Sequence, residues 1–167
     1  MPKITIESVP GKSASFYPEP YASQMGRRTF QELGNAVGLT QFGVDLVTMY
    51  PGDTSSLRHW HSQEDEFLWV VSGELVLIQD EGEQVLRAGD AAGFALGDPN
   101  GHHLQNKSQA EAQYLVIGTR AQNDVCTYSD VDLKYHSNDG NGRFTRHDGS
   151  DVETQHTTAL PQTKGRE

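Results

Sequence analysis

The 167-residue sequence predicts a single all-β domain. Between Phe42 and Tyr128, short runs of branched aliphatic and aromatic residues alternate with turn signals built from Gly, Pro and Asp. Strands this short and this closely punctuated are typical of a β-sandwich or a β-barrel. The connections are too short for the helical crossovers that a parallel sheet needs.

Residues 1–40 are predicted to form an N-terminal arm that packs on this domain. Prolines in the segment disfavour a helix and interrupt strand pairing. The aromatic residues Phe16, Tyr17 and Tyr21 would be costly to leave in water, so we expect the arm to lie against the rest of the chain. For residues 26–39 a single helical turn and an irregular edge strand fit equally well.

The predicted strands lie between residues 41 and 130. Each combines a β-prone run with a flanking turn, such as Pro51-Gly52 or Asp80-Glu81-Gly82. We expect strands at 44–50, 57–61, 66–71, 75–79, 84–87, 92–95, 103–106, 114–118 and 125–128. Residues 131–167 are more polar, and we expect a C-terminal arm that ends in a flexible tail over 151–167.

Several predicted strands are apolar on both faces. If Glu66 points inward, then Leu68 and Val70 do so too, and Phe67, Trp69 and Val71 point outward. An antiparallel sheet with one wet face should instead alternate apolar and polar residues. We therefore expect another surface to cover this face, and a homodimer is the favoured arrangement.

Composition and charge exclude several classes of protein. The net charge of −10 disfavours nonspecific binding to nucleic acid, which needs basic surface. The sequence contains no apolar run long enough to span a membrane, and its first residues do not resemble a signal peptide. Cys126 is the single cysteine, which fits a reducing compartment, so a cytoplasmic location is expected.

The stretch from His59 to Glu66 carries the strongest chemical signal. Because residues i and i+2 of a strand face the same side, His59 and His61 should project together. Two imidazoles with a carboxylate nearby supply most of a divalent-metal site. The other acidic residues of the stretch, Glu64 and Asp65, are interpreted as part of a solvated turn.

Two motifs in this sequence resemble those of the cupin superfamily. The first is Gly52, six residues, His59-x-His61, four residues, Glu66, six residues, Gly73; the second runs from Gly89 through Gly97 and His102 to Asn106. The wider stretch from Tyr17 to Arg120, with residues 143–149, is similar to small single-domain bacterial cupins that are loosely described as sugar-phosphate-isomerase-like.

The resemblance implies a double-stranded β-helix, a small jelly-roll barrel over residues 41–130. It also implies that the metal ligands are His59, His61, Glu66 and His102. The neighbouring His103 is the other candidate in the second motif. The spacing to Asn106 and the alternation of the strand both favour His102.

Three imidazoles and one carboxylate would bind one divalent transition metal per chain, either Mn, Fe, Co, Ni or Zn. Such a set leaves coordination positions open for a ligand, as catalytic metals do. The fold supports isomerase and dioxygenase chemistry alike, so a small-molecule enzyme of either type is expected. The alternative is a cupin that binds or senses a metabolite without catalysis. The sequence identifies no catalytic residue, since only Glu74 offers an unassigned inward acid or base.

Overall fold

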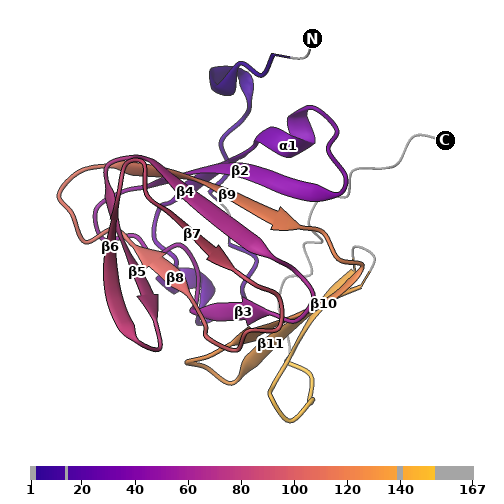
Figure 1. Ribbon diagram of the computed structural model, residues 1–167. Helices are drawn as coiled ribbons and strands as arrows, with labels where there is room; N and C mark the ends of the chain where they lie inside the picture. Colours follow the sequence, from indigo (N-terminus) through magenta and orange to yellow (C-terminus); the bar gives the residue numbers. More distant parts are fainter. Residues whose placement is uncertain (1–2, 14, 139–140, 153–167) are drawn as a thin grey trace.

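The computed structural model describes residues 3–13, 15–138 and 141–152 (Figure 1). The N-terminal arm contains two 3-10 turns, η1 (Ile6–Ser8) and η2 (Ala22–Gln24), followed by strand β1 (Thr29–Glu32) and helix α1 (Leu33–Ala36). The segment for which helical turn and edge strand fitted equally well therefore holds one of each. Residues 153–167 lie outside the described residues, so the flexible tail stays a prediction.

Within the described residues, the strands form three antiparallel sheets, ordered β1-β2-β9-β4-β7, β12-β11-β10-β3 and β6-β5-β8. The strands after β1 are β2 (Phe42–Met49), β3 (His59–His61), β4 (Glu66–Ser72), β5 (Glu74–Gln79), β6 (Gly82–Arg87), β7 (Ala91–Phe94), β8 (His103–Gln105), β9 (Ala112–Thr119), β10 (Asn123–Tyr128), β11 (Leu133–Asn138) and β12 (Asn141–Thr145).

The nine strands predicted from residue 44 to residue 128 are all present, as β2 to β10. Two further strands, β11 and β12, follow where the sequence predicted only a polar arm. They pair with each other and extend the sheet that contains β3. Their sequence is polar because only one face is buried, and Leu133 and Phe144 are the apolar residues that face the interior.

Two hydrophobic clusters hold the sheets together. The larger cluster lies inside the barrel and includes Leu68, Val70 and Leu104, which the sequence predicted to point inward. The smaller cluster joins the N-terminal arm to β10, β11 and β12. Tyr17 of the arm packs there at 6.4 Å from Phe144, measured between ring centroids. These contacts join the arm to the sheet that contains β10, while the division of the chain into arm, barrel and tail stays a prediction.

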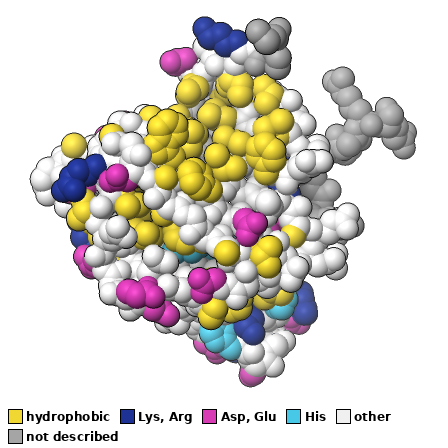
Figure 2. All heavy atoms as spheres, in the orientation of Figure 1, with side chains coloured by type: hydrophobic (Ala, Val, Ile, Leu, Met, Phe, Trp, Pro, Cys, Tyr) yellow, Lys and Arg dark blue, Asp and Glu magenta, His cyan; other side chains and the backbone are white. Residues whose placement is uncertain are grey.

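The outer face of β4 remains in contact with solvent in this chain. Phe67, Trp69 and Val71 keep 45%, 48% and 45% of their surface exposed. Figure 2 shows hydrophobic side chains gathered over the sheet that contains β2, β4 and β9. The outward direction of these residues matches the sequence prediction, while the homodimer stays a prediction. None of the helices in the described ranges has the length and apolar character that a bilayer span requires.

Candidate metal centre

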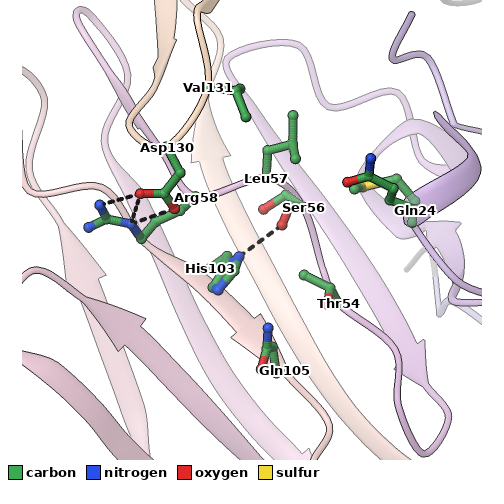
Figure 3. A pocket seen from close by; sticks show the side chains of 10 residues that line it. Gln24, Thr54, Ser56, Leu57, Arg58, His103, Gln105, Asp130 and Val131 are labelled. Carbon is green, nitrogen blue, oxygen red and sulfur yellow. Dashed lines mark hydrogen bonds and ion pairs between the residues drawn. The ribbon is translucent and has the colours of Figure 1, made fainter. Parts of the chain in front are cut away.

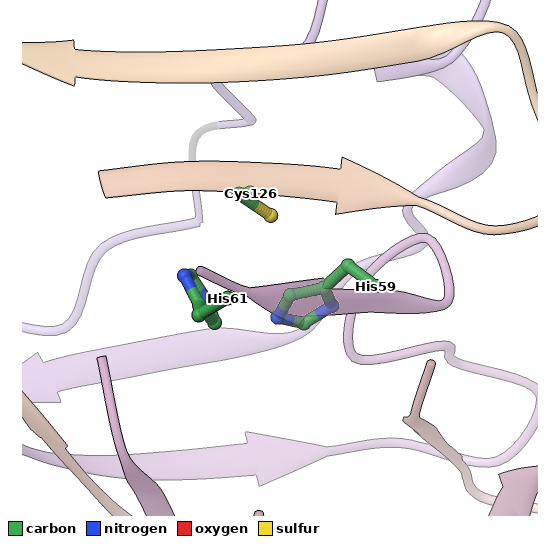
Figure 4. A group of neighbouring side chains, drawn as sticks. All are labelled: His59, His61 and Cys126. Carbon is green, nitrogen blue, oxygen red and sulfur yellow. The ribbon is translucent and has the colours of Figure 1, made fainter. Parts of the chain in front are cut away.

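Strand β3 holds His59 and His61 on one face. It pairs antiparallel with β10, so that His61 lies opposite Cys126 and His59 lies opposite Tyr128. Figure 4 shows both imidazole rings together on β3, with the Cys126 side chain on the adjacent strand. The ring centroids of the two histidines are 5.0 Å apart. This is the arrangement that the His-x-His spacing predicts.

The Nδ1 atoms of both histidines are already bonded to protein acceptors. His59 Nδ1 lies 2.9 Å from the Leu57 carbonyl oxygen, and His61 Nδ1 lies 2.6 Å from Asp124 Oδ2. Because a carbonyl and a carboxylate only accept hydrogen bonds, each Nδ1 carries the proton and donates it. Each Nε2 is then left with a free lone pair, as metal binding requires.

Glu66 and His102 complete the cluster from two other parts of the chain. Glu66 begins β4, while His102 precedes β8 and pairs with His59 through backbone hydrogen bonds of 2.8 and 3.1 Å. The Nε2 atoms of His59 and His61 lie 3.9 and 3.8 Å from Glu66 Oε2. His102 Nε2 lies 3.5 Å from Glu66 Oε1. The three predicted histidine ligands therefore surround the Glu66 carboxylate; His59, Glu66 and His102 form the tightest group, and His61 approaches it through Glu66.

The cluster is electrostatically unusual for a protein interior. Burial alone would raise the pKa of Glu66, but the neighbouring His102 and His59 imidazoles outweigh it and hold that pKa well below its usual range. Burial lowers the pKa of His102, although Glu66 opposes this effect. These shifts favour an ionised Glu66 and a neutral His102, the protonation states of metal ligands. Burial lowers the pKa of His61, but its hydrogen bond to Asp124 and the charge of Glu66 outweigh this and raise that pKa.

The residues present fit a divalent metal ion. Ligand atoms of His59, Glu66 and His102 all lie within 4.8 Å of one another. Among the described residues, His102 is the one with buried side-chain nitrogens that lack any hydrogen-bond partner. A buried polar atom without a partner is costly, and an ion beside Nε2 would supply one. The mixture of imidazole and carboxylate donors suits first-row transition metals.

Sequence reasoning missed two acidic residues that contact this cluster. Asp124 is 4% exposed and accepts hydrogen bonds from Ser62 Oγ and the Gln63 backbone, in addition to holding His61. Glu64 was interpreted as part of a solvated turn, and this is wrong. Its side chain is 24% exposed, lies 3.9 Å from His61 Nδ1 and accepts a hydrogen bond from the Ala121 backbone. The Glu64–His61 contact joins residues three apart, but the bonds of Asp124 to His61 and of Ala121 to Glu64 join segments 63 and 57 residues apart, which no local pattern marks.

Cys126 is a third neighbour that the sequence did not indicate. Its sulfur lies within 4.8 Å of ligand atoms of both His59 and His61. Burial raises the pKa of the Cys126 thiol far above its ordinary value, so the group is neutral rather than a thiolate. Glu74, the one unassigned inward acid suggested by strand alternation, instead forms an ion pair with Arg87 at 3.1 Å.

A small cavity of about 40 Å³ opens beside the cluster. The Phe94 ring stacks on the His102 ring at 3.5 Å between centroids and forms one wall. The other walls are mainly polar. The residues that line this cavity, here called the inner cavity, are Trp60, His61, Glu64, Glu66, Gln79, Gly93, Phe94, Ala95, Asp98, Asn100 and His102.

A larger cavity of about 200 Å³ lies on the outer side of β8, and we call it the outer cavity (Figure 3). His103 faces it and donates its Nδ1 proton to the Ser56 carbonyl oxygen over 3.0 Å. Arg58 lies at its edge, bound to Asp130 at 2.7 Å and to Asp80. His102 and His103 therefore face two different cavities, as the strand alternation predicted.

This fold and this cluster are those of the cupin class, and the comparisons agree. The Cupin domain model matches residues 45–118. A solved cupin-superfamily sugar phosphate isomerase from Silicibacter pomeroyi is 43% identical, with 91% of this chain and 97% of that chain covered and a TM-score of 0.88. The chain belongs to the cupin superfamily and has its double-stranded β-helix fold.

Two more distant structures show the same fold. A protein from Acidithiobacillus ferrooxidans, provisionally named a sugar phosphate isomerase, is 29% identical over 77% of this chain and 81% of its own, with a TM-score of 0.69. The polyketide cyclase from Streptomyces resistomycificus is 16% identical over 71% of this chain and 79% of its own, with a TM-score of 0.60, and shares the fold alone. No curated protein matches the sequence.

Proposed function

We propose that this cupin is a divalent-metal-dependent enzyme of the isomerase type that acts on a small organic molecule. The observation that carries the proposal is the convergence of the His59, His61 and His102 Nε2 atoms on the Glu66 carboxylate, at 3.5 to 3.9 Å. The 43% identity to a protein named as a sugar phosphate isomerase supports isomerase rather than dioxygenase chemistry.

The bound ion would act as a Lewis acid toward a hydroxyl or carbonyl oxygen of the substrate. Hydrogen bonds from His59 to Leu57 and from His61 to Asp124 keep both Nε2 atoms directed toward Glu66. Glu66 supplies negative charge that offsets the charge of the ion.

An isomerase also needs a group that accepts and returns a proton. Glu64 fits this role because it lines the inner cavity and is not one of the four proposed ligands. Burial raises the pKa of Glu64 above its ordinary value, which makes its carboxylate a better proton acceptor. One of its oxygens accepts a hydrogen bond from the Ala121 backbone, which holds the side chain in place.

The test combines metal analysis with proton exchange. Protein purified without a histidine tag should contain about one transition metal per chain, and His61→Ala should lose it. The metal-loaded protein should incorporate deuterium from D₂O at a carbon of one sugar in a panel, as followed by NMR, and Glu64→Gln should abolish this exchange. Oxygen uptake without exchange would instead indicate a dioxygenase. Tight binding of one metabolite with no turnover would indicate a sensor.

We also propose that the chain forms a homodimer through the exposed face of β4. Phe67, Trp69 and Val71 form a nonpolar surface that a second copy could cover. Light scattering should give twice the chain mass of 18.4 kDa. Trp69→Lys should shift the protein toward monomer, and a wild-type monomer at micromolar concentration would contradict the proposal.

A further inference from the structure

The walls of the inner cavity carry acidic and amide groups rather than basic ones. Three carboxylates line it, those of Glu64, Glu66 and Asp98. Two residues with amide side chains, Gln79 and Asn100, lie among them. Neither Lys nor Arg is found among the described residues that line this cavity.

This distribution of charge disfavours an anionic ligand. Three carboxylates line the cavity against the two positive charges of a divalent ion, so the loaded site offers an anion little positive charge. A phosphate or carboxylate group would add to it in a partly buried environment, where charges are poorly screened. Arg58 precedes the ligand strand but is bound to Asp130 and Asp80 at the outer cavity, so its charge is already neutralised.

The same groups are suited to a ligand with several hydroxyl groups. Carboxylate and amide oxygens accept hydrogen bonds from hydroxyls. The Asn100 amide already accepts from the Asp80 backbone and donates to Glu81, whereas the Gln79 side chain makes no hydrogen bond with another described residue and is the amide left for a ligand. One oxygen of Asp98 accepts a hydrogen bond from the Asn100 backbone at 3.1 Å, which leaves its other oxygen for a ligand.

A second observation shows that the cavity is built to be filled at its inner end. His102 is 4% exposed and lines the cavity, and within the described ranges neither of its ring nitrogens has a hydrogen-bond partner; Glu66 Oε1 lies 3.5 Å from Nε2. The cavity itself holds only about 40 Å³, so a ligand would place one end there and extend past Asp98, which is exposed at the mouth.

We propose that the inner cavity binds a small polyhydroxylated molecule that carries no anionic group, such as a free sugar. This inference rests on the proposed metal-dependent function and specifies its substrate class. It departs from the name of the 43% identical structure, which refers to a sugar phosphate. The difference lies in the phosphate, because the walls offer a hydroxyl many acceptors and offer a phosphate no cation except the ion.

The experiment compares matched ligands by isothermal titration calorimetry on protein shown by elemental analysis to be metal-loaded. The probes are ribose, glucose and mannose, each with its terminal phosphate monoester. We expect at least one free sugar to bind at least about tenfold more tightly than its phosphate. Tighter binding of the phosphates overturns the inference, as does failure of all six probes to bind at 10 mM. Protein that takes up no metal overturns the proposed function instead.

Two charge reversals separate a local effect from the effect of net charge. Asp98→Lys places a cation at the cavity mouth and should shift the affinity ratio at least about fivefold toward the phosphate. Glu111→Lys makes the same change in net charge at an exposed residue just before β9, at the end of that strand remote from Gly118, which pairs with Glu66. It should leave the ratio unchanged. Equal shifts in both variants would overturn the inference, because the walls of the cavity would then not decide the preference.

Discussion

The two cavities on either side of β8 differ in how their polar groups are satisfied. The outer cavity is larger, at about 200 Å³ against about 40 Å³ for the inner one. In the outer cavity, Arg58 is neutralised by two carboxylates and His103 is bonded to the Ser56 carbonyl. In the inner cavity, neither ring nitrogen of His102 has a hydrogen-bond partner among the described residues. Glu66 there faces three imidazoles, His102 among them, at 3.5 to 3.9 Å.

Cavity volume alone therefore does not locate a reactive site. Polar groups that satisfy one another stabilise a structure and leave little capacity to bind a ligand. A buried group without a partner carries a free-energy cost that an ion or a substrate can remove. By this criterion we propose the smaller cavity as the functional one, and the adjacent histidines provide the means to test it.

The largest expected effect separates His102 from His103. His102→Ala removes a proposed ligand and should weaken binding of Zn²⁺ or Mn²⁺ by about 100-fold, or about 2.8 kcal/mol. His103→Ala removes an imidazole of the same size from the outer cavity and should change the dissociation constant by less than about twofold. Calorimetric titration with each metal measures both. Equal losses in the two variants would show that the inner cluster is not the binding site.

Removal of the metal should destabilise the protein by a similar amount. A ligand present at 100 times its dissociation constant stabilises the folded state by about 2.7 kcal/mol, which corresponds to a shift in melting temperature of about 5 to 10 °C for a chain of this size. Thermal denaturation with and without a chelator should show this shift in the wild type and in His103→Ala. It should be absent from His102→Ala, and its persistence there would place the ion elsewhere.

A smaller difference should separate Asp124 from Asp130. Each carboxylate binds a side chain at the edge of one cavity, His61 for Asp124 and Arg58 for Asp130. Asp124→Asn should weaken metal binding by about 10- to 100-fold, since the partner that orients a metal-binding histidine is lost. Asp130→Asn should leave it unchanged, and circular dichroism checks that both variants are folded. Wild-type affinity in Asp124→Asn would remove its assigned role of orienting His61.

The smallest expected effect concerns the outer ion pairs. The Asp80 and Asp130 side chains are 59% and 58% exposed, and pairs with exposed partners contribute little. Arg58→Ala should reduce the free energy of unfolding by about 1 kcal/mol, partly through lost packing of its stem, as measured by urea denaturation. Metal affinity should not change. A large loss of metal in this variant would show that the two cavities are coupled and not independent.

Local patterns in the sequence were sufficient to predict much of this protein. Turn residues and β-prone runs located β2 to β10, because strand formation leaves a period of two that can be recognised within a few residues. The same period placed His59 and His61 together and directed His102 and His103 to opposite sides. The resemblance to cupins supplied the pairing of the two motifs. The structure places the three proposed histidine ligands around Glu66.

Only the tertiary structure revealed the surroundings of those ligands. Asp124 contacts His61 because β10 pairs with β3, and Asp124 lies 63 residues further along the chain. The burial of Glu64, the neighbouring Cys126 thiol and the pairing of β11 with β12 likewise depend on which strands meet. Strand pairing between distant segments leaves no mark in either segment alone. The sequence by itself therefore supplied the candidate metal ligands to be tested, whereas the fold decided which groups contact them and which charges line the cavity.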